Sequence, residues 1–167
     1  DAFDELSPCV WAIETGLSSD PLMNAHVSRF DNLGLISNSD AHSPQKLGRE
    51  ANVMQFEDEK DISYNEIMRI IREQDKQKFL YTIEFYPEEG KYHFDGHRDC
   101  KFVCHPTETK KKYKGICPVC RKSLVIGVMN RVIELADRTE NEARAALRIP
   151  YKSMVPLPEI IADTLQK

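Results

Sequence analysis

The sequences HRDC at residues 97–100 and CPVC at residues 117–120 decide how the middle of this chain folds. They form two pairs of potential metal ligands, His97 with Cys100 and Cys117 with Cys120, and two residues separate the members of each pair. This gap lets a tight turn direct both side chains at one ion, and zinc prefers thiolate and imidazole donors in tetrahedral geometry. The spacing therefore predicts a zinc ribbon whose ion is structural, because four protein ligands leave no position for a reacting water.

Other residues near the two pairs could replace one of these ligands. His93, Cys104 and His105 all lie close enough in the sequence to compete for the fourth position. His97 is favoured because its spacing to Cys100 is the same as that of the second pair. A plainer interpretation also stands, in which His97 is an exposed histidine and Cys100 a buried cysteine.

The charge of the predicted ribbon differs from that of the whole chain. The net charge is −4, yet eight basic residues and only two acidic ones lie between residues 97 and 122. A run of lysines is often no more than a solvated face, but basic residues on a zinc module favour contact with nucleic-acid phosphates. Phe102 and Tyr113 are expected either to stack on bases or to fill the small ribbon core. The candidates for DNA contact are Arg98, Lys101, Lys111, Lys112 and Lys122.

The composition is that of an ordinary globular protein. With 41% hydrophobic and 30% charged residues, the chain of 167 residues can bury one core and an appended module. No apolar run approaches the roughly 18 residues of a membrane span, and no signal-peptide pattern precedes the first apolar stretch. Five cysteines, three of them at ligand spacing, indicate thiolates in a reducing compartment rather than disulfides. We therefore expect a cytoplasmic protein that does not act at a membrane.

The pattern of apolar residues, caps and breakers predicts an α/β fold. Strands are expected over 10–14, 33–37, 52–56 and 79–85, and helices over 21–30, after Ser63, over 128–138, after Thr139 and from near Pro158. Ser19-Asp20-Pro21 is expected to supply a cap followed by proline at the first helical position, with Ser19 as the N-cap. Ser63 with Glu66 and Thr139 with Glu142 are expected to form capping boxes. The chain then divides into an α/β part over 1–80, a zinc-ribbon module over 81–126 and a helical tail over 127–167.

A second candidate site is the sequence Ser39-Asp40-Ala41-His42, which follows the predicted strand 33–37. Asp40 and His42 are two residues apart, so at an extended strand end their side chains leave the same face and can reach one metal. In α/β folds, chemistry is usually placed at the carboxyl ends of strands. As a bare pattern the pair is common, and its plain interpretation is a loop carboxylate and a surface histidine.

The sequence around this pair resembles a known superfamily. Residues 34–44, GLISNSDAHSP, are similar to the last metal-binding motif of the PHP (polymerase and histidinol phosphatase) phosphoesterases, whose distorted β/α barrel holds two or three divalent metals. Residues 12–21, 82–100, 127–138 and 150–160 resemble those PHP phosphoesterases that carry a zinc ribbon, the endonuclease Q-like family. The resemblance implies the carboxyl-terminal part of a PHP-type barrel, followed by a small zinc ribbon and a helical tail.

The resemblance also implies an activity. Asp40 and His42 would be catalytic residues and ligands of Mg²⁺, Mn²⁺ or Zn²⁺, and the ribbon ligands would hold structural Zn²⁺. Enzymes of this family nick DNA on the 5′ side of deaminated bases such as uracil and hypoxanthine. The early PHP motifs, including a His-x-His pair, are absent, and only His26 precedes Asp40. We therefore expect a fragment of a longer metal-dependent endonuclease that is inactive alone, with Glu14, Ser18, Ser19 and Asp20 near its catalytic face.

Two other functions are compatible with these features. One is a non-catalytic DNA-binding or adaptor module that serves a repair helicase, in which Asp40 and His42 are vestigial. The other is a PHP phosphatase that acts on a small phosphoester and uses the ribbon only for structure. Binding to damaged and undamaged duplexes separates the first alternative from an endonuclease, and the salt dependence of DNA binding tests the second.

Overall fold

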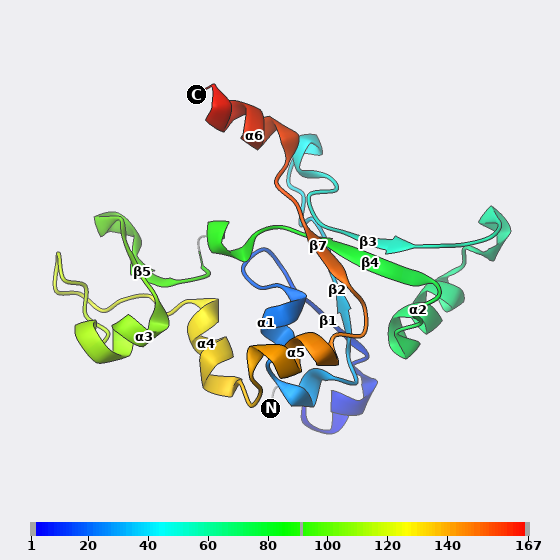
Figure 1. Cartoon of the computed structure of the whole chain (residues 1–167), viewed down its shortest axis with the longest axis horizontal. Helices are drawn as coiled ribbons and strands as arrows, with labels where there is room; N and C mark the ends of the chain where they lie inside the picture. The colour runs from blue at the N-terminus through cyan, green and yellow to red at the C-terminus, as the bar shows by residue number, and fades with distance from the viewer. Residues whose placement is uncertain (1–2, 91, 166–167) are drawn as a thin grey trace.

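The first sheet joins two short parallel strands of the amino-terminal part. The computed structural model describes residues 3–90 and 92–165 and has the mixed α/β architecture expected from the sequence (Figure 1). Strands β1 (Ala12–Glu14) and β2 (Gly34–Ile36) are paired, and helix α1 (Pro21–Ala25) connects them. A Cβ atom at Gly34 would stand 2.8 Å from the carbonyl oxygen of Ile71, so glycine lets helix α2 (Tyr64–Glu73) approach β2 closely.

The second sheet has three strands in the order β3-β4-β7. Strand β4 (Phe79–Glu84) is central, with β3 (Ala51–Met54) antiparallel on one side and β7 (Tyr151–Ser153) parallel on the other. Helix α2 links β3 to β4 and turns an apolar face to the sheet. The core between them consists of three buried apolar residues: Ile70, Phe79 and Ile149.

The ribbon segment forms a small unit with its own core. Strands β5 (Asp95–His97) and β6 (Phe102–Cys104) are antiparallel, and the short helix α3 (Pro106–Glu108) follows them. Three buried residues fill its interior: Cys104, Cys117 and Leu124. Phe102 and Tyr113 pack against this core with their rings edge to face, 5.0 Å between centroids, so their side chains serve the core of the ribbon.

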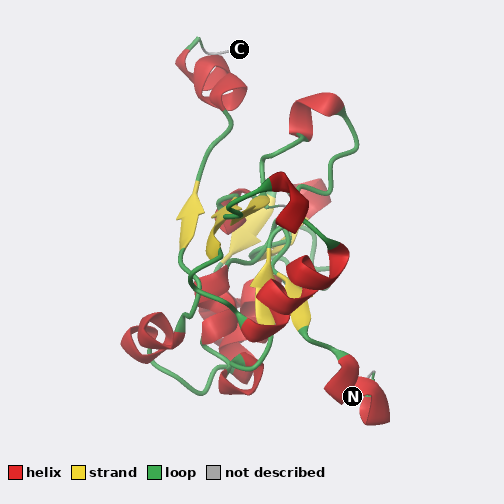
Figure 2. Ribbon diagram, turned by 90° about the vertical axis from the view of Figure 1, so that its right-hand side faces the viewer, coloured by secondary structure: helices red, strands yellow, loops and turns green. Residues whose placement is uncertain are grey.

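The carboxyl-terminal segment returns to the α/β part before it leaves the body of the molecule. Helices α4 (Val128–Leu135) and α5 (Glu140–Ala146) follow the ribbon, and α5 lies beside α1. Helix α6 (Leu157–Thr164) then projects from the sheet, and Figure 2 shows the two chain ends on opposite sides of the molecule. The described helices are all too short or too polar to cross a membrane.

Short helical turns connect these elements. Six are 3₁₀ turns and the last, inside the ribbon, is a turn of π-helix: η1 (Asp4–Cys9), η2 (Ser28–Phe30), η3 (Pro44–Lys46), η4 (Glu59–Asp61), η5 (Pro87–Glu89), η6 (Arg98–Cys100) and η7 (Thr109–Tyr113).

The helix predicted over 21–30 is wrong in its length, because α1 ends at Ala25. The loop after α4 forms hydrogen bonds with the backbone groups that would have continued helix α1. The amide of Asp137 donates to the carbonyl oxygen of His26 (3.0 Å), and its carboxylate accepts from the amide of Ser28 (2.9 Å). Bonds from a segment more than 100 residues away thus replace the last helical turns.

The cap predicted for this helix is also wrong by one residue. Asp20, not Ser19, has the extended backbone of an N-cap, and its carboxylate accepts a hydrogen bond from the amide of Met23 at 2.7 Å. The hydroxyl of Ser19 instead donates to the carbonyl oxygen of Thr15. The capping box predicted at Thr139 is confirmed in full. At Ser63 only half of the predicted box forms: the hydroxyl of Ser63 accepts from the amide of Glu66, while the Glu66 carboxylate binds Arg69 and Lys78.

The three predicted parts of the chain are joined more closely than a linear division suggests. Strand β4, which spans the expected boundary at residue 80, pairs with β3 of the first part and with β7 of the predicted tail. Lys91, which belongs to the module expected over 81–126, lies outside the described residues. The division itself, and the barrel expected from the PHP resemblance, remain predictions, since the described strands form three separate sheets.

Candidate metal centre and catalytic loop

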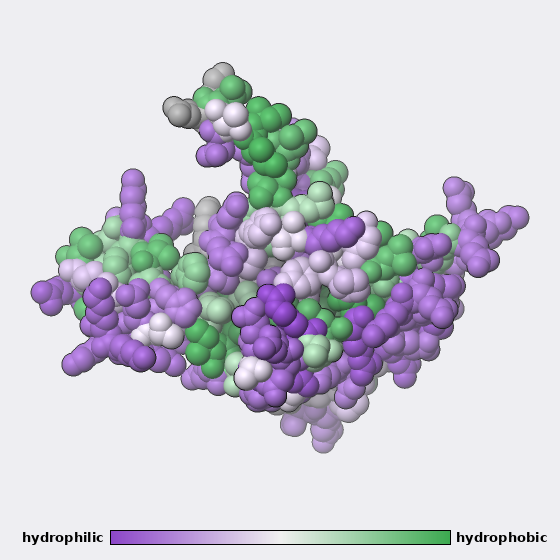
Figure 3. Space-filling view, viewed as in Figure 1, coloured by the Kyte–Doolittle hydropathy of each residue, from purple (hydrophilic) through white to green (hydrophobic). Residues whose placement is uncertain are grey.

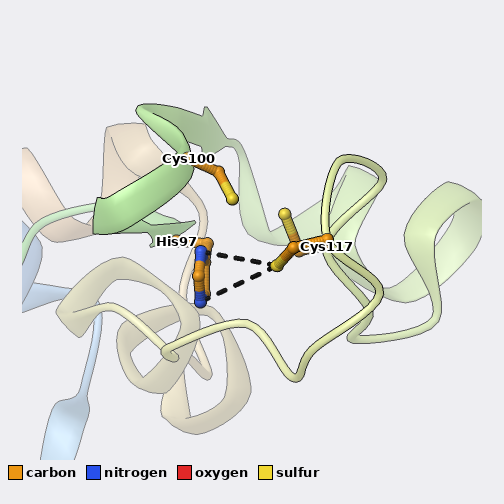
Figure 4. A group of neighbouring side chains, drawn as sticks. His97, Cys100 and Cys117 are labelled. Carbon is orange, nitrogen blue, oxygen red and sulfur yellow. Dashed lines mark hydrogen bonds between the residues drawn. The ribbon is translucent and has the colours of Figure 1, made fainter.

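The four side chains predicted to bind zinc converge at one end of the ribbon. One ligand atom from each of His97, Cys100, Cys117 and Cys120 lies within 4.8 Å of all the others, and Figure 4 shows three of these side chains pointing toward a common centre. The Cys120 sulfur is 3.7 Å from Nδ1 of His97. Donors around a tetrahedral zinc stand about 3.5–4 Å apart. The cluster therefore fits a zinc ion with little movement.

Two similar turns present these ligands. The residue directly after the second ligand of each pair is left-handed: Lys101 has φ of 49° and Arg121 has φ of 64°. The amide of Arg121 donates to the carbonyl oxygen of Cys117 (3.0 Å), and the amide of Lys101 donates to that of Arg98 (3.0 Å). Both turns reverse the chain immediately behind the ligands, as the spacing of two residues predicts.

The thiols of the cluster differ in acidity because their neighbours differ. A hydrogen bond with Cys120, followed by burial, raises the pKa of Cys100 to about 11. Burial also raises the pKa of Cys117, but the amides of Cys120 and Val119 point at its sulfur and the net direction is downward. Since the thiolate is the form that binds metal, the surroundings of Cys117 favour its metal-binding form more than those of Cys100 do.

The alternative ligands point elsewhere. His93 is buried, and its Nδ1 lies 3.1 Å from the carbonyl oxygen of Ser18. The Cys104 sulfur is 3.2 Å from the hydroxyl of Thr109, in the interior of the ribbon. His105 bonds its neighbour at position 107 and caps α3. The structure therefore places His97 beside Cys100, Cys117 and Cys120, and places none of the three alternative ligands there.

Asp40 and His42 lie in an exposed loop after β2, which ends at Ile36. Their side chains are 72% and 86% exposed, and Nδ1 of His42 is 2.9 Å from the backbone carbonyl oxygen of Asp40. Because a carbonyl can only accept, Nδ1 is the donor in this contact, and Nε2 is the nitrogen left for another partner. Within the described residues, only the ribbon has three or more histidine, cysteine or acidic side chains close enough to hold a metal. Asp40 and His42 thus lie close together in an open loop, without a third candidate ligand beside them among the described residues.

The predicted DNA contacts are all exposed on the ribbon. Arg98 and Lys101 line a groove of about 540 Å³ beside the metal cluster, together with Tyr92 and Phe102. Hydrophobic side chains lie among hydrophilic ones on this part of the surface (Figure 3). The remaining candidates, Lys111, Lys112 and Lys122, have side chains open to solvent.

Sequence patterns did not identify a buried carboxyl in the second sheet. Glu84 is fully buried at the end of β4, and its oxygens accept from the hydroxyls of Thr15 (2.9 Å) and Thr82 (2.5 Å). Burial raises its pKa to about 7, opposed by these hydrogen bonds. Glu50 is buried nearby, and its Oε2 lacks a hydrogen-bond partner among the described residues. The sequence signal that could have identified Glu84 is its position inside the largely apolar run 79–85.

Asp95 has a structural role that the sequence also did not reveal. Its buried carboxylate accepts from the amide of Gly127 and from the side-chain amide of Asn130, both at 2.7 Å. Gly127 is required at this contact, because a Cβ atom there would stand 2.4 Å from the carbonyl carbon of Phe94. These bonds attach the first strand of the ribbon to α4, so the metal cluster is fixed to the helical segment.

No protein-family model matches the chain. An uncharacterized protein of Methanocaldococcus jannaschii is 34% identical over 93% of the chain, and the uncharacterized protein YqxK of Bacillus subtilis is 31% identical over 93%. The chain spans only 20% and 38% of the length of these curated relatives.

Two solved structures are similar to the chain in both fold and sequence. The lesion-specific endonuclease PfuEndoQ of Pyrococcus furiosus has a TM-score of 0.76 and 32% identity, over 94% of this chain and 38% of its own. Endonuclease Q in complex with a 27-mer duplex substrate, which has an abasic lesion at the active site, has a TM-score of 0.72 and 29% identity over the same shares. The chain is thus similar in sequence and fold to about two fifths of a lesion-specific DNA endonuclease.

Proposed function

We propose that this chain belongs to a longer metal-dependent endonuclease that acts in DNA repair and nicks DNA at damaged bases. The observation that carries the proposal is the likeness to PfuEndoQ and to an endonuclease Q–DNA complex, at 32% and 29% identity over 94% of the chain. Identity at this level over nearly the whole chain supports a shared function more than a shared fold would alone. The proposed substrate is DNA with deaminated bases such as uracil or hypoxanthine, and the proposed location is the cytoplasm.

In this proposal the two candidate sites have different tasks. The ribbon cluster holds structural zinc, and Asp40 with His42 contributes two ligands to a divalent metal centre, with Mg²⁺, Mn²⁺ or Zn²⁺ as candidates. Such a metal lowers the pKa of a bound water and neutralises charge on the attacked phosphate. The remaining ligands would come from outside this chain, since two donors do not hold a bimetal centre against water.

The ribbon supplies DNA contacts in the proposed enzyme. Arg98, Lys101, Lys111, Lys112 and Lys122 are exposed and carry positive charge on a chain whose net charge is −4. Phosphate contacts of this kind position a protein on DNA without specifying sequence. The groove beside the cluster has apolar walls and carries both basic residues, Arg98 and Lys101, and acidic ones, Glu88 and Glu89. Its apolar walls suit a base taken out of the stack.

The test is a nicking assay with the longer protein. Matched duplexes with one deoxyuridine, one deoxyinosine or no lesion are incubated with the protein and Mg²⁺ or Mn²⁺. We expect a single nick 5′ of the lesion and none in the undamaged duplex. Equal cleavage of damaged and undamaged DNA would contradict the proposed specificity, and hydrolysis of small phosphoesters without any nicking would favour a phosphatase.

Reversal of charge at Lys111 and Lys112 should weaken DNA binding without preventing catalysis. Replacing both by glutamate removes two phosphate contacts and adds repulsion, so we expect at least a tenfold weaker Kd for every duplex and a flatter dependence on salt. Fluorescence anisotropy between 50 and 200 mM salt measures both effects. The matched control reverses Lys60 and Lys76, which lie away from the ribbon. Unchanged binding in the ribbon variant would remove these lysines from the interface.

A specific observation also favours a second candidate, the non-catalytic adaptor for a repair helicase. Among the described residues, Asp40 and His42 are not joined by a third histidine, cysteine or acidic ligand. A longer protein that bound damaged DNA without cutting it would support the adaptor. Stimulation of a helicase on the same damaged duplexes would then be the property to measure.

A further inference from the structure

The loop with Asp40 and His42 is held by a side chain from the neighbouring strand. Asn52 of β3 pairs with the backbone of Ser37: its Oδ1 accepts from the Ser37 amide (3.0 Å), and its Nδ2 donates to the Ser37 carbonyl oxygen (2.7 Å). The same Nδ2 lies 3.3 Å from Oδ1 of Asn38. The side-chain amide of Asn52 thus pairs with the backbone just after the end of β2, in the way that a neighbouring strand would.

Two further contacts fix the next residues of the loop. Nε of Arg49 donates to the carbonyl oxygen of Ser39 at 2.8 Å, and its Nη2 lies 3.5 Å from that of Asp40. Ser37 itself is fully buried, and its hydroxyl donates to the carbonyl oxygen of Ile83 in β4 (2.8 Å). Each residue from 37 to 40 is therefore bonded to β3, β4 or the segment just before β3.

The conformation of Asp40 explains why such bonds are needed. Its φ of 45° is left-handed, a region that costs free energy for a residue with a side chain. The Asp40 carbonyl oxygen also accepts from Nδ1 of His42, which directs Nε2 outward. Asn52 and Arg49 are consequently connected to the imidazole of His42 through hydrogen bonds to the loop backbone. Neither residue forms a hydrogen bond with the carboxylate of Asp40.

We propose that Asn52, assisted by Arg49, is a positioning residue that holds Asp40 and His42 in the arrangement that binds the catalytic metal. This inference rests on the proposed function, because it assigns Asp40 and His42 to that metal. Without the Asn52 bonds the loop can leave the left-handed conformation, and the two ligands then separate. Loss of the Asn52 hydrogen bonds therefore weakens metal binding and slows catalysis, while the DNA contacts on the ribbon stay intact.

The test compares Asn52→Leu, which keeps the size of the side chain and removes its hydrogen bonds, with the wild-type longer protein. We expect Mn²⁺ affinity, measured by titration calorimetry, to fall at least tenfold. The kcat for nicking should fall at least thirtyfold at limiting Mn²⁺ and recover in part when Mn²⁺ is raised. The KM for damaged duplex should stay within twofold. Asn65→Leu, an exposed asparagine on α2, is the matched control and should behave as wild type.

A second variant covers the case in which Asn52→Leu does not fold. Arg49→Lys retains the charge but loses the planar guanidinium, so we expect a threefold to tenfold loss of Mn²⁺ affinity at an unchanged Tm. A lower Tm with wild-type Mn²⁺ affinity in both variants would overturn the inference, because the residues would then be structural only. If the wild-type protein binds Mn²⁺ but nicks no duplex, the proposed function fails, and the Mn²⁺ affinities still decide the role of Asn52.

Discussion

Replacing Asp40 by alanine in the longer protein should abolish nicking of damaged DNA and leave DNA binding unchanged. The carboxylate is 72% exposed, so its loss removes the proposed metal donor without disturbing the core. Loss of a ligand to a catalytic metal removes the charge stabilisation on which hydrolysis depends, and we expect a fall on the order of 10³-fold or more. Single-turnover nicking of a deoxyuridine duplex at saturating protein measures the effect.

Two controls separate this result from a general loss of function. Asp61→Ala removes another exposed carboxylate, outside the loop, and should nick at the wild-type rate. The Kd of Asp40→Ala for the same duplex, measured with Ca²⁺ in place of the active metal, should stay within twofold. Normal cutting by Asp40→Ala would show that the loop is not catalytic and would make the adaptor the preferred function.

The chain of 167 residues alone should nick no DNA.

Replacing Cys117 by alanine should remove the zinc from the chain and unfold the ribbon. Cys117 is completely buried at the centre of the ribbon core, and it is one of four donors within 4.8 Å of one another. Structural zinc in a small module contributes about 10–16 kcal/mol of apparent binding free energy, most of which becomes folding free energy. We expect zinc content to fall from about one ion per chain to near zero, measured by plasma mass spectrometry after dialysis.

The unfolding should be confined to the ribbon. Hydrogen exchange over residues 95–125 should become fast in Cys117→Ala, while amides of β3 and β4 keep their protection, since that sheet has a separate core. Cys9→Ala is the matched control, because Cys9 is exposed and outside the cluster. Full zinc content in Cys117→Ala, or no zinc in the wild-type chain, would contradict the prediction that this segment is a zinc ribbon.

Local spacing explains why the ribbon was predictable from the sequence. Each ligand pair is closed by a turn of a few residues, so the spacing alone restricts where the two side chains can point. The same holds for the caps at Ser63 and Thr139, whose bonds join residues three apart. These features need no information from distant parts of the chain, and the structure has them where the sequence indicated.

The loop with Asp40 and His42 was only half predictable. The residues Asp40 and His42 could be chosen from the motif, but the residues that hold them could not. Asn52 lies fifteen positions from Ser37 and reads in the sequence as an ordinary polar residue in a short strand. Its importance depends on the register of β3 against the loop, which the local pattern does not encode.

By itself, the sequence determined the four side chains of the His/Cys cluster, the α/β character and the position of the candidate pair Asp40 and His42. The tertiary structure alone decided the early end of α1, the existence of β7 and the burial of Glu84. β7 has three residues and pairs with β4, about 70 residues earlier in the chain, so it exists only where the folded sheet offers a free edge. The buried carboxylate of Glu84 accepts a hydrogen bond from Thr15, 69 residues earlier in the chain, and such a long-range contact forms only after distant segments pack together.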